Sequence, residues 1–146
     1  MARVEHLFTA LVHCFPVREV DEAQAILDKG FEGCMHGRRG SKRQVLLMEA
    51  ETLEKLRVLP GDVKENVTTR GLVHRALGEG DRLWIGEAIL EVTAPCHPCS
   101  RMDEIRRGLQ EELRGQRGIL CRVVHAGVIR RGDAIEKVAT AARAGA

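Results

Sequence analysis

Residues 81–93 read DRLWIGEAILEVT, and this segment indicates the fold most clearly. Two runs rich in apolar and β-branched residues, 81–85 and 88–93, stand on either side of Gly86-Glu87. A two-residue connection with glycine in its first position is typical of a β-hairpin, because glycine readily takes the positive φ that such a turn needs. The segment therefore predicts two antiparallel strands joined by a tight turn.

Strand patterns continue on both sides of this hairpin. Apolar residues in alternating or continuous runs predict strands at 3–13, 44–48, 63–72, 119–124, 128–131 and 134–138. The segment 20–27 is short and fits either type of element. Good helix formers at 49–57 predict a helix that ends before Pro60-Gly61, and Ser100 predicts the N-cap of a second helix that runs to about Arg114. Because strands predominate, we expect a mainly β protein, a β-barrel or sandwich with one or two peripheral helices.

The composition fits one folded domain of ordinary size. Of the 146 residues 44% are hydrophobic and 30% are charged, which supplies enough apolar surface for a core and excludes an intrinsically disordered protein. We expect a single domain over 1–138, followed by an alanine-rich, frayed tail over 139–146. A net charge of +2 and an aromatic content of 3% argue against nucleic-acid binding, which needs a larger basic surplus or a stacking surface.

The sequence also carries expectations about location and redox state. No apolar run reaches the ~20 residues that cross a bilayer, and the N-terminus lacks the pattern of a secretion signal. We therefore expect a soluble cytoplasmic protein without membrane association. Five cysteines are an odd number in such a chain, which predicts reduced thiols rather than a disulfide framework. Cys14 and Cys121 lie in apolar strand patterns, where cysteine usually serves as a small buried hydrophobe.

The motif Cys96-His97-Pro98-Cys99 is the strongest candidate for chemistry. It stands between a predicted strand and a predicted helix, and Cys99 comes directly before the Ser100 cap. A thiolate at a helix N-terminus is stabilised by the free backbone N–H groups and by the helix dipole, so we expect Cys99 to be the reactive sulfur, with a depressed pKa. His97 is either an exposed loop residue or a hydrogen-bond donor to a ligand beside Cys99.

Two other uses of these cysteines stay open. A thioredoxin-like dithiol also precedes a helix, but in that fold a later cis-proline faces the disulfide, and Pro98 is the last proline of this chain. A zinc site could draw on Cys96, Cys99, Cys121 and His125. If 119–125 is a strand, four steps of ~3.3 Å separate Cys121 from His125 by about 13 Å, which is too far for one tetrahedral ion.

Two further segments are candidates for ligand contacts. Residues from His36 to Arg43 carry four cations among glycines, Arg38, Arg39, Lys42 and Arg43, which suits either an anion site or a solvated loop. Lys64-Glu65-Asn66 precedes Thr68 in a strand-like stretch. The Asn66 amide offers two N–H donors and one acceptor oxygen, so it can read the edge of a heterocycle or cap a local turn.

Taken together, these motifs resemble the MOSC domain, the molybdenum cofactor sulfurase C-terminal domain, in its small stand-alone bacterial form. The resemblance runs from about Val4 to Val138. It rests on the order and spacing of Gly33-Cys34-Met35-His36-Gly37, Arg43-Gln44-Val45-Leu46-Leu47, Lys64-Glu65-Asn66-Val67-Thr68-Thr69-Arg70-Gly71-Leu72, Gly80-Asp81-Arg82-Leu83-Trp84-Ile85-Gly86, Pro98-Cys99, and Gly127-Val128-Ile129 through Gly132-Asp133. The chain departs from the family pattern at Cys34, where many members have Asp.

The resemblance implies a barrel-like, mostly β fold and a site for a pyranopterin molybdenum cofactor or for sulfur carried to it. Cys99 matches a cysteine that is a thiolate ligand of molybdenum in some members and is proposed to carry a persulfide in others. Lys64 and Asn66 match positions near the pterin. Lys42 or Arg43 matches a basic position that meets the cofactor phosphate.

Two classes of function follow from the resemblance. One is a molybdenum-dependent reductase of N-oxygenated substrates, and the other is a binding or carrier module, for a pterin, a small anion or sulfur, without turnover of its own. The chain has neither the cysteine spacing of an iron–sulfur site nor a Gly-x-Gly-x-x-Gly fingerprint, so a reductase needs a separate electron donor. Sulfur delivery needs a separate cysteine desulfurase, because no domain remains to bind pyridoxal phosphate.

Overall fold

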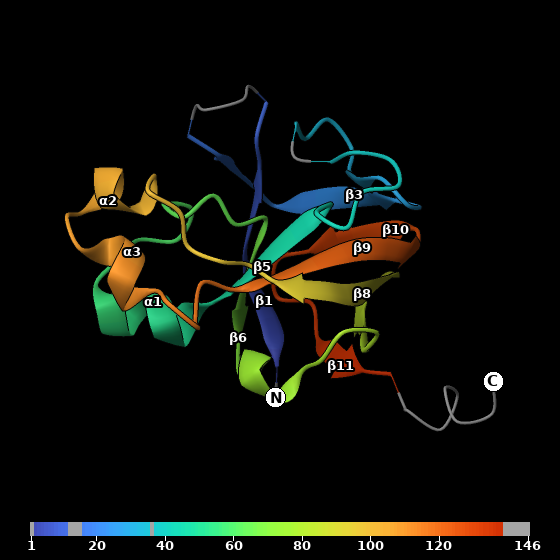
Figure 1. Ribbon diagram of the computed structural model, residues 1–146. Coiled ribbons are helices and arrows are strands. Elements are labelled where there is room, and N and C mark those ends of the chain that lie inside the picture. The colour runs from blue at the N-terminus through green and yellow to red at the C-terminus, as the bar shows by residue number, and fades with distance from the viewer. Residues whose placement is uncertain (1, 12–15, 36, 139–146) are drawn as a thin grey trace.

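The computed structural model describes residues 2–11, 16–35 and 37–138. The expected tail over 139–146 lies outside the described residues, and so do Cys14 and His36. The described chain is mainly β, as the sequence predicts (Figure 1). Its elements are β1 (Arg3–Thr9), β2 (Arg18–Val20), β3 (Glu22–Ile26), β4 (Gly30–Phe31), β5 (Val45–Glu49), α1 (Ala50–Leu56), β6 (Val67–Arg70), the 3-10 helix η1 (His74–Ala76), β7 (Arg82–Ile85), β8 (Ala88–Pro95), α2 (Met102–Ile105), α3 (Leu109–Glu112), β9 (Ile119–His125), β10 (Gly127–Arg130) and β11 (Ile135–Lys137).

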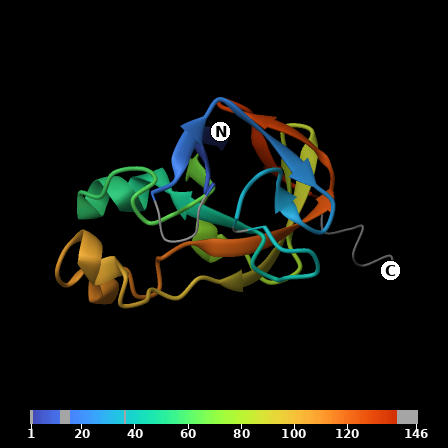
Figure 2. The same cartoon turned by 90° about the horizontal axis from the view of Figure 1, so that it is seen from above.

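The strands of the described residues form two sheets around one core. The larger sheet has eight strands in the order β11-β7-β8-β9-β5-β6-β1-β2, and the smaller has three, in the order β10-β3-β4. The Val4 N–H donates to the Asp133 carbonyl at 2.8 Å, so the large sheet curls and the approach to β11 returns beside β1. Figure 2, seen from above, shows the strands arranged around this interior. Fully buried Leu7 and Leu83 of the large sheet pack there with Ala25 and Ile129 of the small one.

The predicted hairpin is confirmed. β7 and β8 pair antiparallel on either side of Gly86-Glu87, and Gly86 has a φ of 56°. A Cβ at Gly86 would also come within 2.3 Å of the Asp133 carboxylate, so glycine is needed for space as well as for φ. β8 continues to Pro95 and leads directly into Cys96, as the sequence predicts.

Several strand limits differ from those predicted. β1 ends at Thr9 rather than at 13, and its register against β6 shifts between Val4 and His6, which breaks the alternation read from the sequence. The ambiguous segment 20–27 contains the end of β2 and all of β3. The strand predicted over 63–72 is confined to β6, so Lys64-Glu65-Asn66 lies in the loop before it.

The α-helices α1, α2 and α3 lie together on one side of the strands, as both views show (Figures 1 and 2). α1 fits its prediction and ends where Arg57 takes a left-handed φ of 57°. The single helix predicted from Ser100 to Arg114 is wrong: extended backbone at Arg106 and a φ of 90° at Gly108 divide it into α2 and α3. None of the described helices has the length and apolar character that crossing a bilayer requires.

Candidate functional site

A pocket of about 390 Å³ opens where four segments of the chain meet. These segments are the basic loop before β5, the loop between α1 and β6, the residue after β8 and the approach to β9. Its described lining consists of Met35, Arg38, Ser41, Arg43, Leu46, Lys64, Asn66, Cys96, Arg117 and Leu120. Three of the site residues expected from the sequence, Arg43, Lys64 and Asn66, thus line one pocket.

The lining of this pocket is strongly cationic. Its described residues include four cations, Arg38, Arg43, Lys64 and Arg117, and no carboxylate, although the whole chain has a net charge of only +2. A concave surface that carries charges of one sign focuses its field and attracts ligands of the opposite sign. The pocket therefore suits an anion.

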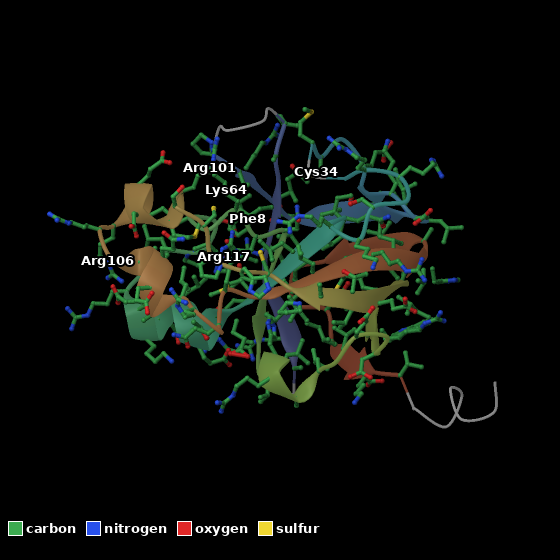
Figure 3. The ribbon with its side chains drawn as sticks, viewed as in Figure 1. Phe8, Cys34, Lys64, Arg101, Arg106 and Arg117 are labelled. Atoms are coloured by element: carbon green, nitrogen blue, oxygen red, sulfur yellow. The ribbon has the colours of Figure 1, made fainter. Side chains whose placement is uncertain are left out.

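Arg117 is the cation of this lining whose side chain is buried, and the sequence did not indicate it as a site residue. The residue is 6% exposed, and its Nη2 donates to the Val63 carbonyl at 2.6 Å. Its Nε and Nη1 are also buried, but within the described residues neither has a hydrogen-bond partner. Buried charged donors without an acceptor are costly, and a guanidinium fork matches the oxygens of phosphate. In Figure 3, Arg117 and Lys64 lie between the helices and β5.

Close backbone packing places Arg117 at the pocket. The next residue, Gly118, has a φ of 125°, and a Cβ there would come within 2.3 Å of the Leu47 carbonyl in β5. In the sequence, Arg117 stands between Gln116 and Gly118 in a turn and resembles a solvated arginine. A glycine directly before the buried strand β9 was the one signal that this turn approaches the sheet closely.

Lys64 has a strained backbone. Its φ is 67°, in the left-handed region, where a residue with a Cβ is disfavoured by about 1–2 kcal/mol. Its N–H donates to the Gly61 carbonyl at 3.0 Å, which closes a tight turn. A lysine held where glycine would be easier is an observation that favours a functional role for the side chain.

Glu65 stands in the sequence between the lining residues Lys64 and Asn66, and it is fully buried. Its Oε2 accepts a hydrogen bond from Thr68 Oγ1 at 2.7 Å, whereas Oε1 has no partner within the described residues. Desolvation raises the pKa of this carboxyl, and hydrogen bonds and the charge of Arg117 oppose the rise. Burial therefore has a larger influence on the pKa of this carboxyl than its hydrogen bonds and the charge of Arg117.

The Asn66 amide makes three hydrogen bonds that hold the wall of the pocket in place. Its Oδ1 accepts from the Leu46 N–H at 3.0 Å, and its Nδ2 donates to the Phe8 carbonyl at 3.2 Å and to Cys34 Sγ at 3.4 Å. Both amide hydrogens are therefore used inside the protein. The group that Asn66 offers to a ligand is the second lone pair of Oδ1, so it can accept one hydrogen bond from a heterocycle but has no donor left.

The two cysteines of the C-x-x-C motif occupy different environments. Cys96 is 6% exposed and lines the pocket, and its N–H donates to the Gly118 carbonyl at 2.9 Å. Cys99 is exposed and is not among the lining residues. α2 begins at Met102 and has four residues, so Cys99 does not stand directly at the start of a long helix, as was expected. The helix dipole at Cys99 is correspondingly weak.

The remaining candidates lie away from the lining. Lys42 and His97 are exposed, and the Lys42 carbonyl accepts a hydrogen bond from Thr93 Oγ1 in β8. Within the described residues no three His, Cys, Asp or Glu side chains are placed to hold a metal together. Cys121 is fully buried in the core, where desolvation strongly raises its pKa. The His125 ring stacks on the Trp84 ring, with 5.9 Å between the ring centroids. The zinc alternative therefore has no support.

A second hollow of about 650 Å³ lies beside α1 and η1. Its lining mixes cations with the carboxylates of Glu49 and Glu79, so it lacks the uniform charge of the first pocket. His74 lines it, and burial lowers the pKa of His74 to about 4 while Glu49 and Glu51 oppose this shift. The smaller cationic pocket is the better candidate for a dedicated anion site.

The MOSC domain model matches residues 35–136, more than half of the sequence, and the chain belongs to this family. The fold is similar to that of the YuaD protein from Bacillus subtilis, with a TM-score of 0.77 and 23% identity over 92% of this chain and 93% of that one. It is also similar to YiiM from Escherichia coli, with a TM-score of 0.73 and 23% identity over 95% of this chain and 70% of that one. For YiiM from Geobacillus stearothermophilus the TM-score is 0.79 and the identity 18%, over 95% of this chain and 76% of that one.

These TM-scores establish a shared fold of the small stand-alone type. No curated protein matches the sequence. The MOSC family is associated with the molybdenum cofactor and with sulfur-related functions. The fold and the family are thus settled, whereas the ligand of this chain has to be argued from its pocket.

The position of Cys34, where many members have Asp, now has a physical account. Cys34 Sγ accepts hydrogen bonds from the Ala10 N–H at 3.3 Å and from Asn66 Nδ2 at 3.4 Å. A carboxylate in this place could accept from the same two donors. In this chain the cysteine supplies that acceptor to Asn66, at 7% exposure and without joining the pocket lining.

Proposed function

We propose that this pocket binds a phosphate-bearing pyranopterin molybdenum cofactor. The observation that carries the proposal is Arg117, whose two unpartnered buried donors stand in a pocket lined by three more cations. A phosphate oxygen is the acceptor that completes such a donor set. A volume of about 390 Å³ lies within the usual range for small-molecule sites.

Different residues contact the two ends of such a ligand. Arg117 and Lys64 hold the phosphate, and Arg43 adds a flexible charge from the basic loop. Asn66 accepts one hydrogen bond from the pterin edge, and apolar Leu46 and Leu120 pack beside it. When bound, the cofactor supplies two-electron redox chemistry at molybdenum, which fits reduction of N-oxygenated substrates and requires a separate electron donor. Cys99 stays the proposed thiolate ligand, which requires its loop to turn toward the pocket.

Sulfur carriage is the second candidate function, and the exposure of Cys99 favours it. An exposed thiol is accessible to the persulfide of another protein, whereas a buried one is not. In this reading the pocket positions an anionic cofactor or its precursor, and a separate cysteine desulfurase provides the sulfur. Both functions use the same cationic pocket, so one binding experiment addresses both.

The test is retention of the cofactor by protein purified from a host that makes it. We expect molybdenum and pterin to copurify with the parent protein, and Arg117→Met to retain at least tenfold less, because charged hydrogen bonds contribute about 1.5–3 kcal/mol each. The control is Arg114→Met, which removes an exposed arginine paired with Glu111 outside this pocket. Equal retention by Arg117→Met and Arg114→Met, or a parent protein that holds neither molybdenum nor pterin, contradicts the proposal.

A further inference from the structure

The C-x-x-C motif places one sulfur in the pocket and the other in solvent. Cys96 is 6% exposed and lines the pocket, whereas Cys99, three residues later, is exposed and lies outside the lining. We infer that the two form a sulfur relay, in which Cys99 accepts sulfane sulfur from a persulfide donor and Cys96 receives it and presents it inside the cationic pocket. This inference rests on the proposed function, because it assumes that the pocket's anionic ligand is the acceptor of the sulfur.

The surroundings of Cys96 suit the receiving end. Its backbone is fixed by the hydrogen bond to Gly118, and its side chain packs against Leu46 and Leu120 of the same lining. The pocket also contains Arg117, which is buried and has two unpartnered donors. A persulfide on Cys96 would be anionic, and nearby cations favour an anionic sulfur over its neutral form. Cys96 thus stands where a sulfane sulfur would be both stabilised and directed at a bound ligand.

Because Cys99 is exposed, it is the cysteine that accepts sulfur from the donor. A donor persulfide carried by a protein or by a peptide thiol cannot approach a sulfur that is 6% exposed, but it can approach one on the surface. Three residues of extended chain separate Cα atoms by at most about 10–11 Å, and a direct S–S bond between two cysteines needs a Cα separation of roughly 4.4–6.8 Å. Transfer of a sulfane sulfur places one more sulfur atom between the two cysteines, so it takes place at a longer separation than a disulfide. Residues 96–99 have no regular secondary structure, so a turn of this segment is enough to bring the sulfurs together.

The relay consists of two balanced exchanges. In the first, the Cys99 thiolate attacks the outer sulfur of the donor R–S–SH, an S–S bond forms on Cys99, and R–S⁻ leaves with the electron pair. In the second, the Cys96 thiolate attacks the outer sulfur of the Cys99 persulfide, so the S–S bond moves to Cys96 and Cys99 returns to a thiolate. The proton of each persulfide passes to solvent or to the leaving thiolate. No net oxidation or reduction takes place.

Site-resolved mass spectrometry tests the relay on the full chain. The protein is treated briefly with glutathione persulfide, alkylated at successive times and digested with trypsin. Both cysteines then lie in the peptide 83–101, and fragmentation between His97 and Pro98 assigns the extra sulfur to one or the other. We expect the label to appear first on Cys99 and then to accumulate on Cys96. In Cys96→Ser it should remain on Cys99, and in Cys99→Ser the labelling of Cys96 should be at least tenfold slower.

Cys121→Ala is the control, because Cys121 is fully buried in the core and should leave both steps unchanged. Thermal unfolding of each variant establishes that it folds, and a serine variant that does not fold is replaced by the alanine variant. Labelling of Cys96 at the parent rate in Cys99→Ser overturns the relay, and so does label that never leaves Cys99. Release of sulfide with a Cys96–Cys99 disulfide also overturns it, because attack then occurs at the inner sulfur. Phosphate binding by the same samples reports on the proposed function separately.

Discussion

Replacing Lys64 by glycine should lower the affinity of this chain for anions without lowering its stability. Lys64 has a φ of 67°, which disfavours a residue with a Cβ by about 1–2 kcal/mol. Glycine removes this strain but gives the unfolded chain more freedom, which costs about 0.5–1 kcal/mol. The free energy of unfolding of Lys64→Gly should therefore stay constant or rise by up to about 1.5 kcal/mol, although a side chain has been deleted.

Anion affinity should change in the opposite direction. Lys64 lines the pocket and is half-buried, so we take the low end of the range for a charged contact, and expect about tenfold weaker binding of inorganic phosphate. Amide chemical-shift titration measures the binding, and urea denaturation measures the stability. Lys64→Gln is the matched control, since it loses the charge but keeps the strain: its affinity should fall equally and its stability should not rise. A Lys64→Gly variant that is clearly less stable than Lys64→Gln, or that binds phosphate like the parent, refutes this reasoning.

Three further predictions concern stability and its dependence on pH. The pKa of Glu65 is raised in the folded state, so the stability that this group contributes is fully present below its unfolded pKa of 4.5 and is lost as the pH rises through the folded pKa. The free energy of unfolding from urea denaturation should fall over this range by up to about 1.4 kcal/mol per pH unit, and Glu65→Gln should abolish this fall. The pKa of His74 is lowered from 6.5 to about 4, so the free energy of unfolding should fall by about 3 kcal/mol as the pH falls from 6.5 to 4. If His74→Gln loses the same stability over this range, another group is responsible. The Cβ of Gly118→Ala would come within 2.3 Å of the Leu47 carbonyl, so this variant should lose at least about 3 kcal/mol of stability. Gly115→Ala, in open space, should lose about 1 kcal/mol, and similar melting temperatures for the two variants would contradict the close packing before β9.

The sequence predicts those elements whose causes are local. The hairpin at Gly86 follows from one turn and two strand patterns, and it forms as predicted. The helix expected from Ser100 to Arg114 fails because helical spacing of apolar residues does not reveal the extended backbone at Arg106 or the positive φ of Gly108. Met102 of α2 and Leu109 of α3 share a buried cluster with Leu53 of α1, and a local sequence pattern does not contain such contacts.

The candidate site could be predicted in part. Resemblance to a family placed Arg43, Lys64 and Asn66 at one site, and they do line one pocket. The sequence did not identify Arg117, because its value lies in tertiary burial and in donors left without partners. The sequence assigned Cys99 to the site, whereas Cys96 is the sulfur that lines the pocket. Residue spacing fixes the distance along the chain but not the direction of a side chain.

The most direct test of the central claim is a crystal structure of protein purified from a host that makes the cofactor, with anomalous data collected at the molybdenum absorption edge. The account predicts a molybdenum peak in or at the mouth of the pocket lined by Arg43, Lys64 and Arg117, with phosphate density against the Arg117 guanidinium. A molybdenum peak outside this pocket, or phosphate density that makes no contact with Arg117 and Lys64, would contradict it.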